Sequence, residues 1–235
     1  VAQLVVPDEG ISTAENLFDG TPAFHSFIRQ RISRVPASGS HRRVYVSRAG
    51  LGLHRNGLMF EDRIETHLKA AGYQIFHPQR VPLHDQIAMY AGASHLIGVD
   101  GSALHLVAFA AAPGAKVAVL GRRPYYPQAI ASQIERCSGA SATALPPGDQ
   151  IFVRSQSAQS GYPWFWTHCL PDLPRLGHAL HAAGFLDTSP TDWLPPDAQA
   201  LQGRLALISR RNGYALVPLP HQGGSGPCAP PPLSV

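Results

Sequence analysis

The sequence predicts an α/β protein built on a Rossmann-like parallel sheet with helices on both faces. Three features indicate this fold: short strand segments that are apolar throughout, amphipathic segments between them, and connections of only a few residues. A strand without polar alternation is typical of a parallel sheet that is covered on both sides. Its regular alternation with helices favours consecutive right-handed β-α-β units.

The alternation is regular from residue 43 onward. Strands are expected at residues 44–46, 73–77, 95–99 and 116–120. Helices are expected at residues 23–32, 60–71, 85–93, 102–112, 128–136 and 173–183. Two further apolar runs, Leu4–Val6 and Leu205–Ile208, are predicted as strands because they are short. The Pro- and Gly-rich tail from Pro218 is expected to be disordered.

Composition excludes several classes of protein. The 235 residues are 44% hydrophobic and 14% charged, which suits a domain with a sizeable core. The net charge is +4, but the basic residues are dispersed, so no nucleic-acid footprint is expected. Cys137, Cys169 and Cys228 form no CxxC pair, so we expect neither a metal site nor a disulfide framework. No apolar run reaches the roughly 18 residues of a membrane span.

The strongest candidate site is the turn that joins the strand of residues 95–99 to the following helix. It reads Asp100-Gly101-Ser102-Ala103, and His105 lies one turn further along the helix. A buried strand that leads through a glycine turn into a helix presents free backbone N–H groups to phosphate. The alternative is an ordinary strand–turn–helix of an α/β core. In that case Ser102 is a helix N-cap and His105 a core residue.

Other strand ends add candidates to this edge of the sheet. Arg48 follows the first strand and is placed to meet a diphosphate from the side opposite the helix terminus, unless it is a surface residue of its loop. Of the 19 Lys and Arg residues, only Lys69 and Lys116 are lysines, and arginine binds phosphate bidentately. The excess of arginine over lysine is also explained by a GC-rich genome. The chain has no P-loop, no GxGxxG after a strand and no GxSxG, which argues against NTPases, classical dehydrogenases and α/β-hydrolases.

The order of these pieces resembles glycosyltransferase family 61. It runs through a strand ending in Ser47-Arg48, an acidic helix start, a strand ending in His77-Pro78, an Asp-Gln pair and the glycine turn. The residues that carry the resemblance are Val44–Arg48, Phe60–Asp62, Gly72–Pro78, Asp85–Gln86, Ile97–His105 and Ala112–Leu120. It covers about residues 41–121, and more loosely the forty before them.

The resemblance implies an inverting, metal-independent hexosyl- or pentosyltransferase that needs no cofactor. Its partners would be a nucleotide-sugar donor and a glycan or polysaccharide acceptor, as in capsule biosynthesis. The expected location is the bacterial cytoplasm, with peripheral association with the inner face of the membrane left open. Cysteine usage also suggests a reducing compartment. The oligomeric state is left open.

The resemblance also implies that this chain is the C-terminal half of a GT-B fold. Residues 1–40 would be a remnant of the N-terminal domain and a linker. Residues 41–187 would form the nucleotide-sugar-binding domain, and residues 188–235 a C-terminal extension with a disordered tail. Because the sequence starts at Val1 rather than Met, we expect an N-terminal portion to be missing.

Roles for individual residues follow as hypotheses. Arg48 and the N–H groups of residues 101–103 would hold the departing diphosphate, and His105 or Gln86 would hydrogen-bond the sugar or the nucleotide. Glu61 is the first candidate for the general base and His54 the second. The acidic residues after Phe60 have a simpler explanation, which is that they complement the helix dipole.

Two departures from the family pattern leave a second function open. Asp100 stands where the family often has His, and the Asn that usually precedes Glu61 is absent. Either Asp100 points away from the phosphates or the donor contact differs in this branch. The alternative function is a non-catalytic nucleotide- or glycan-binding module. A different α/β enzyme, such as an epimerase or methyltransferase, ranks last because His77-Pro78 stands where an acidic ribose ligand is expected.

Overall fold

The computed structural model describes residues 20–39, 42–52, 57–123, 126–146, 148, 150–155 and 167–219. These ranges contain a five-stranded sheet in the order β3-β1-β4-β5-β6, with every neighbouring pair parallel. Its strands are β1 (Arg43–Val46), β3 (Gln74–Phe76), β4 (His95–Val99), β5 (Lys116–Leu120) and β6 (Ser141–Leu145). The first four are the predicted strands, whereas β6 was not predicted.

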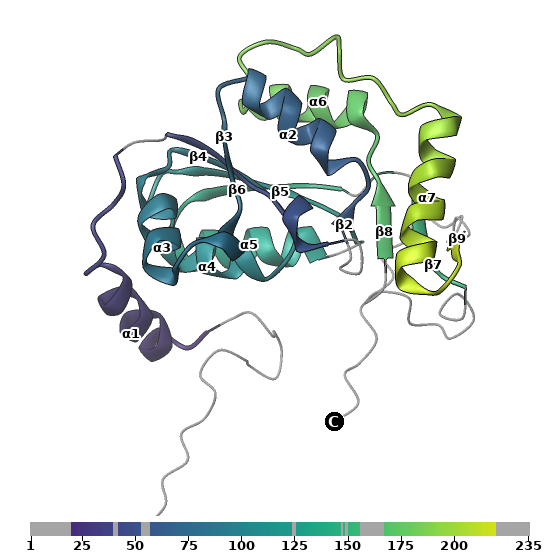
Figure 1. The fold of residues 1–235 in the computed structure, drawn as a ribbon. Helices are drawn as coiled ribbons and strands as arrows, with labels where there is room; N and C mark the ends of the chain where they lie inside the picture. The colour runs from purple at the N-terminus through teal and green to yellow at the C-terminus, as the bar shows by residue number, and fades with distance from the viewer. Residues whose placement is uncertain are drawn as a thin grey trace, which may run out of the picture.

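Helices cover both faces of this sheet, as predicted (Figure 1). Helices α3, α4 and α5 lie on one face, and α2 and α6 lie on the other. The described helices are α1 (Pro22–Ile32), α2 (Glu61–Ala70), α3 (Leu83–Gly92), α4 (Ser102–Ala110), α5 (Tyr126–Ser138), α6 (Leu173–Ala182) and α7 (Ala198–Asn212), with 3-10 turns at Ala49–Leu51 and Pro78–Arg80. The Rossmann-like α/β class is therefore confirmed.

The side chains of each strand point alternately to the two faces of the sheet, and both faces are covered, which explains why the strands are apolar at every position. In β1, Val44 and Val46 pack with α3, α4 and α5, whereas Tyr45 packs with α2 and α6. Leu96 and Ile97 of β4 divide between the two faces in the same way. Successive side chains of a strand point to opposite faces, so a sheet with two covered faces needs apolar residues at every position.

A second sheet was not predicted. It has the order β2-β8-β7-β9 within the described residues, with β2 (Gly57–Leu58) parallel to β8 (Thr167–Leu170). Strands β7 (Gln150–Arg154) and β9 (Leu216–Pro218) complete it in antiparallel pairing. Helix α7 packs against this sheet, and Figure 1 shows the two together at one side of the molecule.

The predicted strand at Leu205–Ile208 is wrong, because these residues lie within α7. The side chain of Asp197 caps the helix by accepting a hydrogen bond of 2.7 Å from the backbone N–H of Ala200, and Gly213 ends it in the left-handed conformation. A run of four apolar residues is too short to show the period of a helix or of a strand. The residues that cap the two ends of α7 are therefore the better indication of a helix here. The predicted disordered tail starts at Pro218, which is the last residue of β9.

Three sequence features lie outside the described residues: the strand predicted at Leu4–Val6, the candidate base His54, and the rest of the tail from residue 220.

Strand order also fixes where a ligand site belongs. From β1 the chain moves to β3 on one side, then crosses to β4, β5 and β6 on the other. The direction of winding therefore reverses between β1 and β4. In doubly wound sheets this switch point opens a crevice at the carboxyl ends of the two strands. Ser47 and Arg48 follow β1 there, and Asp100 and Gly101 follow β4.

Candidate functional site

Arg48 lies directly over the backbone of Gly101. A Cβ atom built on Gly101 would come within 2.5 Å of Nη1 of Arg48 and 3.2 Å of its Cζ. The glycine has φ 157° and ψ −179°, a region that side-chain-bearing residues rarely adopt. The structure thus brings together two of the residues that the sequence placed at the switch point, and glycine is what lets them approach.

The N-terminus of α4 has free backbone donors at this point. Gly101 is the N-cap residue and supplies no side-chain cap. Among the described residues, the N–H groups of Gly101, Ser102 and Ala103 have no hydrogen-bond acceptor. The interpretation of Ser102 as the N-cap is therefore wrong, because Ser102 is the first residue of the helix and its side chain is exposed. Unpaired N–H groups at a helix start form an anion-binding site.

The carboxylate of Asp100 is fully buried and is paired with arginines that follow β5. Its Oδ1 lies 2.7 Å from Nε of Arg122, and its Oδ2 accepts a 3.0 Å hydrogen bond from the Arg122 backbone N–H. Nε of Arg122 also lies 2.9 Å from the Asp100 carbonyl oxygen, and Nη2 of Arg123 lies 3.4 Å from Oδ1. The negative charge of Asp100 is thus offset inside the protein.

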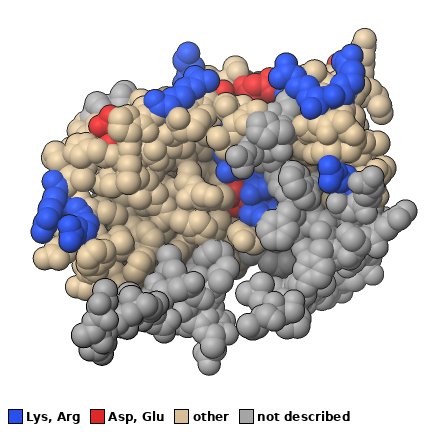
Figure 2. All heavy atoms as spheres, turned by 60° about the horizontal axis from the view of Figure 1, so that its bottom comes forward, with Lys and Arg blue, Asp and Glu red and all other residues tan. Residues whose placement is uncertain are grey.

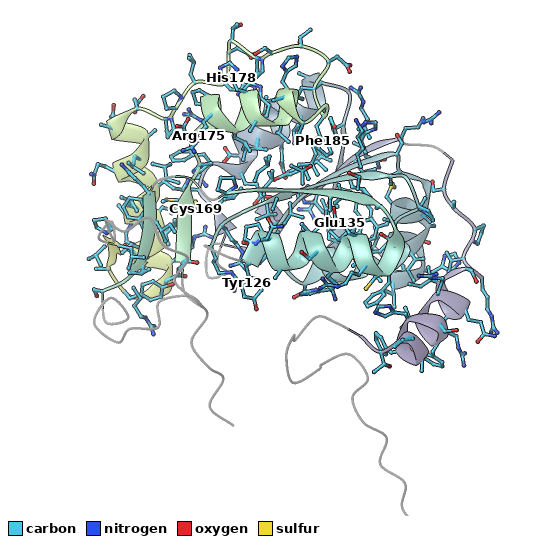
Figure 3. All side chains as sticks on the ribbon, turned by 180° about the vertical axis from the view of Figure 1, so that it is seen from behind. Tyr126, Glu135, Cys169, Arg175, His178 and Phe185 are labelled. Atoms are coloured by element: carbon cyan, nitrogen blue, oxygen red, sulfur yellow. The ribbon has the colours of Figure 1, made fainter. Side chains whose placement is uncertain are left out.

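Positive charge is in excess around Asp100. Burial lowers the pKa of Arg122 to about 10; Asp100 opposes this shift, and the charges of Arg123 and Arg48 add to it. Arg123 stacks on Tyr126, with Cζ 3.7 Å from the ring centroid, at the start of α5 (Figure 3). Figure 2 shows basic and acidic atoms side by side near the middle of one face.

Sequence reasoning missed Arg122 and Arg123 as site residues. Their position could have indicated this, because they come two and three residues after the end of β5 and so lie at the same edge of the sheet as Arg48 and Gly101. An Arg-Arg pair after the fourth predicted strand could have been added to the candidates on that ground.

Glu61 fixes the backbone of the Arg48 loop. Its Oε1 accepts hydrogen bonds of 2.7 Å from the Arg48 N–H and 2.9 Å from the Tyr45 hydroxyl. The side chain is 4% exposed, and burial raises the pKa of its carboxyl, although the Arg48 N–H and Tyr45 act in the opposite direction. Ser47 continues this network by donating a short hydrogen bond to Glu65.

The residue before Glu61 carries backbone strain. Phe60 is the N-cap of α2 and has φ 59° and ψ 32°; no other non-glycine residue in the described ranges has a positive φ. Asn adopts this conformation more readily than Phe, which gives a physical reason for the Asn that the family pattern usually has here. In this chain the Phe60 side chain is buried instead, against Met59, Phe152 and Ile208.

The remaining candidate site residues, His105 and Gln86, form hydrogen bonds with residues outside the Arg48–Gly101 turn. Nδ1 of His105 lies 2.6 Å from Oε1 of Gln133, a buried residue of α5. Nε2 of Gln86 donates to the carbonyl oxygens of Pro78 and Val81, at 2.9 and 3.1 Å, so it holds the loop between β3 and α3. In the described part of the chain, no group of three or more His, Cys, Asp or Glu is arranged to hold a metal ion.

The chain is similar to a known family of proteins. The model of the glycosyltransferase 61 family matches residues 1–118, which include β1, α2, β4 and the glycine turn. No curated protein is significantly similar to the chain. Of the helices in the ranges that the structure describes, none combines the length and apolar character needed to cross a bilayer. Because the family match spans just over half of the 235 residues, this chain belongs to glycosyltransferase family 61.

Proposed function

We propose that the chain transfers a hexose or pentose, with inversion, from a nucleotide sugar to a glycan or polysaccharide acceptor. The observation that carries this proposal is the position of Arg48 over the Gly101 turn. A guanidinium and the free N–H groups of a helix start lie together at the switch point of the sheet. That is where doubly wound proteins bind the phosphates of nucleotides.

The proposed chemistry is a direct displacement. The bond between the sugar carbon and the phosphate oxygen breaks, and its electron pair stays on the departing phosphate. The acceptor hydroxyl forms the new bond to that carbon and gives up its proton to a base. Arg48 and the N–H groups of residues 101–103 would offset the negative charge of the diphosphate as it departs. In this proposal the protein needs no metal ion, and His105 would contact the sugar or the nucleotide.

Glu61 is the proposed general base. Its raised pKa suits the role, because a base works best when its pKa is near the working pH. His54 is the second candidate and lies outside the described residues. The domain arrangement is proposed as well: residues 41–187 would form the donor-binding half of a GT-B enzyme at work in the cytoplasm on capsule or related polysaccharide.

A non-catalytic nucleotide- or glycan-binding module is the second candidate function. The observation in its favour is that Oε1 of Glu61 already accepts two hydrogen bonds, from Tyr45 and from the Arg48 backbone, and that the residue is almost fully buried. A carboxylate in this position holds a loop without needing to accept a proton. Transfer or donor hydrolysis by the purified protein separates an enzyme from a binding module.

Calorimetric titration of the chain with UDP, GDP and CMP tests the donor site. We expect one nucleotide to bind, and Arg48→Ala to weaken that binding by more than about tenfold, since it removes a charge-assisted hydrogen bond. Arg204→Ala is the matched control, because Arg204 pairs instead with Asp62, at 3.1 Å. Binding of no nucleotide, or equal binding by the Arg48 variant, would contradict the proposed site.

A further inference from the structure

One carboxylate faces two buried arginines at the end of β5. Arg122 and Arg123 are 5% and 6% exposed, and both contact Asp100. Nη1 of Arg122 and Nε of Arg123 are nonetheless buried without a hydrogen-bond partner among the described residues. A buried donor without an acceptor destabilises the protein, and it does so more strongly when the group is charged. An anion bound at this place would remove that destabilisation.

The position of Arg122 relates it to the glycine turn. Strands β4 and β5 are neighbours with Val99 beside Leu120, so Asp100 and Gly121 leave the sheet side by side and Arg122 follows at once. Arg48 leaves β1 on the other side of β4. Arg122 contacts Asp100, and Arg48 lies against the Cβ position of the next residue, Gly101, so both arginines reach the same turn. Three adjacent strands thus bring cationic or N–H donors to one edge.

We propose that Arg122 is a second phosphate ligand of this site and that Asp100 positions it. Asp100 holds Nε and the backbone N–H of Arg122. Nη1 is left to donate a hydrogen bond to an oxygen of the donor's β-phosphate, the one that is bonded to the sugar. This inference rests on the proposed function. Arg48 and the start of α4 would contact the other phosphate. Arg122 keeps its proton throughout and stabilises the electron pair that the phosphate oxygen receives.

Charge balance supports the assignment. The groups that act on Arg122 are Asp100, Arg123 and Arg48, which together with Arg122 leave an excess of positive charge. His168 of β8 also lies within reach of Arg122, but burial and the charge of Arg122 lower its pKa to about 4, so it is neutral at pH 7. The excess therefore comes from arginines alone. It suits the two or more negative charges of a departing nucleoside diphosphate.

The test compares diphosphates with monophosphates. UDP and UMP, and GDP and GMP, are titrated into the wild-type chain, Arg122→Lys and the double variant Asp100→Asn/Arg122→Gln. Lysine keeps the charge but loses the planar fork. The double variant removes both partners of the buried pair, which avoids an uncompensated carboxylate. Arg43→Gln is the control, since Arg43 pairs with Asp187 at the opposite end of β1.

We expect both Arg122 variants to bind the diphosphate about tenfold or more weakly, and the monophosphate within about threefold of wild type, since one charge-assisted contact is lost. Thermal unfolding verifies that each variant is folded. If Arg122→Lys does not fold, the comparison of diphosphate with monophosphate binding rests on the double variant. Unchanged diphosphate binding, or an equal loss for both nucleotides, would overturn the role of Arg122 while leaving the Arg48 result intact. Failure of the wild type to bind any nucleotide would overturn the proposed function and this inference together.

Discussion

The guanidinium of Arg48 occupies the space that a side chain on Gly101 would need. The distance from a Cβ built on Gly101 to Nη1 of Arg48 would be only 2.5 Å. These residues are 53 positions apart in the sequence and meet because β1 and β4 pair in parallel, with Val46 beside Gly98. The candidate site therefore requires a glycine at position 101.

Gly101→Ala should therefore abolish nucleotide binding. The added methyl group displaces Arg48, and the backbone conformation of Gly101 costs alanine about 1–3 kcal/mol. Calorimetry measures the binding and urea unfolding the stability. Gly114→Ala is the matched control: Gly114 also has a positive φ, of 81°, but nothing lies within 4 Å of its Cβ position. It should lose stability and keep binding. Binding by Gly101→Ala at wild-type affinity would show that Arg48 is not a ligand.

Glu61→Gln separates the two roles of Glu61. Glutamine keeps an oxygen that accepts the hydrogen bonds of Tyr45 and the Arg48 N–H, but it cannot take a proton. If Glu61 is the general base, transfer should fall by about 10²–10⁴-fold while nucleotide affinity changes little. Tyr45→Phe is the control, because it removes one hydrogen bond to Glu61 and leaves the carboxylate. Equal transfer by Glu61→Gln and wild type would assign Glu61 to positioning Arg48 alone.

His168 should make the protein less stable in acid. Its pKa is about 4 in the folded chain and 6.5 at its ordinary value, mainly because the residue is buried. The unfolded chain therefore binds the proton first as the pH falls. The contribution of His168 to the free energy of unfolding is complete above pH 6.5 and decreases between pH 6.5 and 4, by about 3 kcal/mol in total.

Urea unfolding at several pH values between 4 and 7 measures this effect. His168→Gln should reduce the pH dependence in this window, whereas His178→Gln should not, because His178 is exposed on the outer side of α6 (Figure 3). The same pH dependence in all three proteins would mean that other groups account for it.

Gly98 sets how closely α4 approaches the sheet. A Cβ on Gly98 would lie 2.7 Å from Cδ2 of Leu104 and 3.3 Å from Cβ of Val46. Gly98→Ala should cost about 1–3 kcal/mol of stability through overpacking. Leu104→Ala relieves the clash, so the double variant should be more stable than the sum of the single effects predicts. Gly57→Ala, with nothing within 4 Å of its Cβ position, is the control. Strict additivity would contradict the contact.

Local sequence patterns were enough to predict four of the five strands of the central sheet. Each of β1, β4 and β5 is an apolar run ended by a polar residue or a glycine, and the helices between them begin and end with recognisable residues. The same patterns placed Arg48 and Gly101 at one edge, because the carboxyl ends of parallel strands meet there.

What could not be predicted depends on partners far along the chain. Strand β2 has two residues and exists only because Gly57 and Leu58 pair with His168 and Cys169. The partner of Asp100 is likewise set by strand order, which brings Arg122 beside it from 22 positions away. Gln86 was placed in the site by the family resemblance, and this stays a prediction. The sequence did not indicate that its Nε2 donates to the carbonyl oxygens of Pro78 and Val81 in the preceding loop.

The family match stops at residue 118, inside β5, yet one side of the sheet is completed by later residues. Tyr45, Ile97 and Ala118 are shielded by α6 and by Phe185 and Trp193. A protein cut after the matched region would present that apolar layer to water and would lose the strand that holds β2 beside α2. The part of this chain that the family model matches is therefore smaller than its folding unit, and any trimming of this protein has to keep the chain through Trp193.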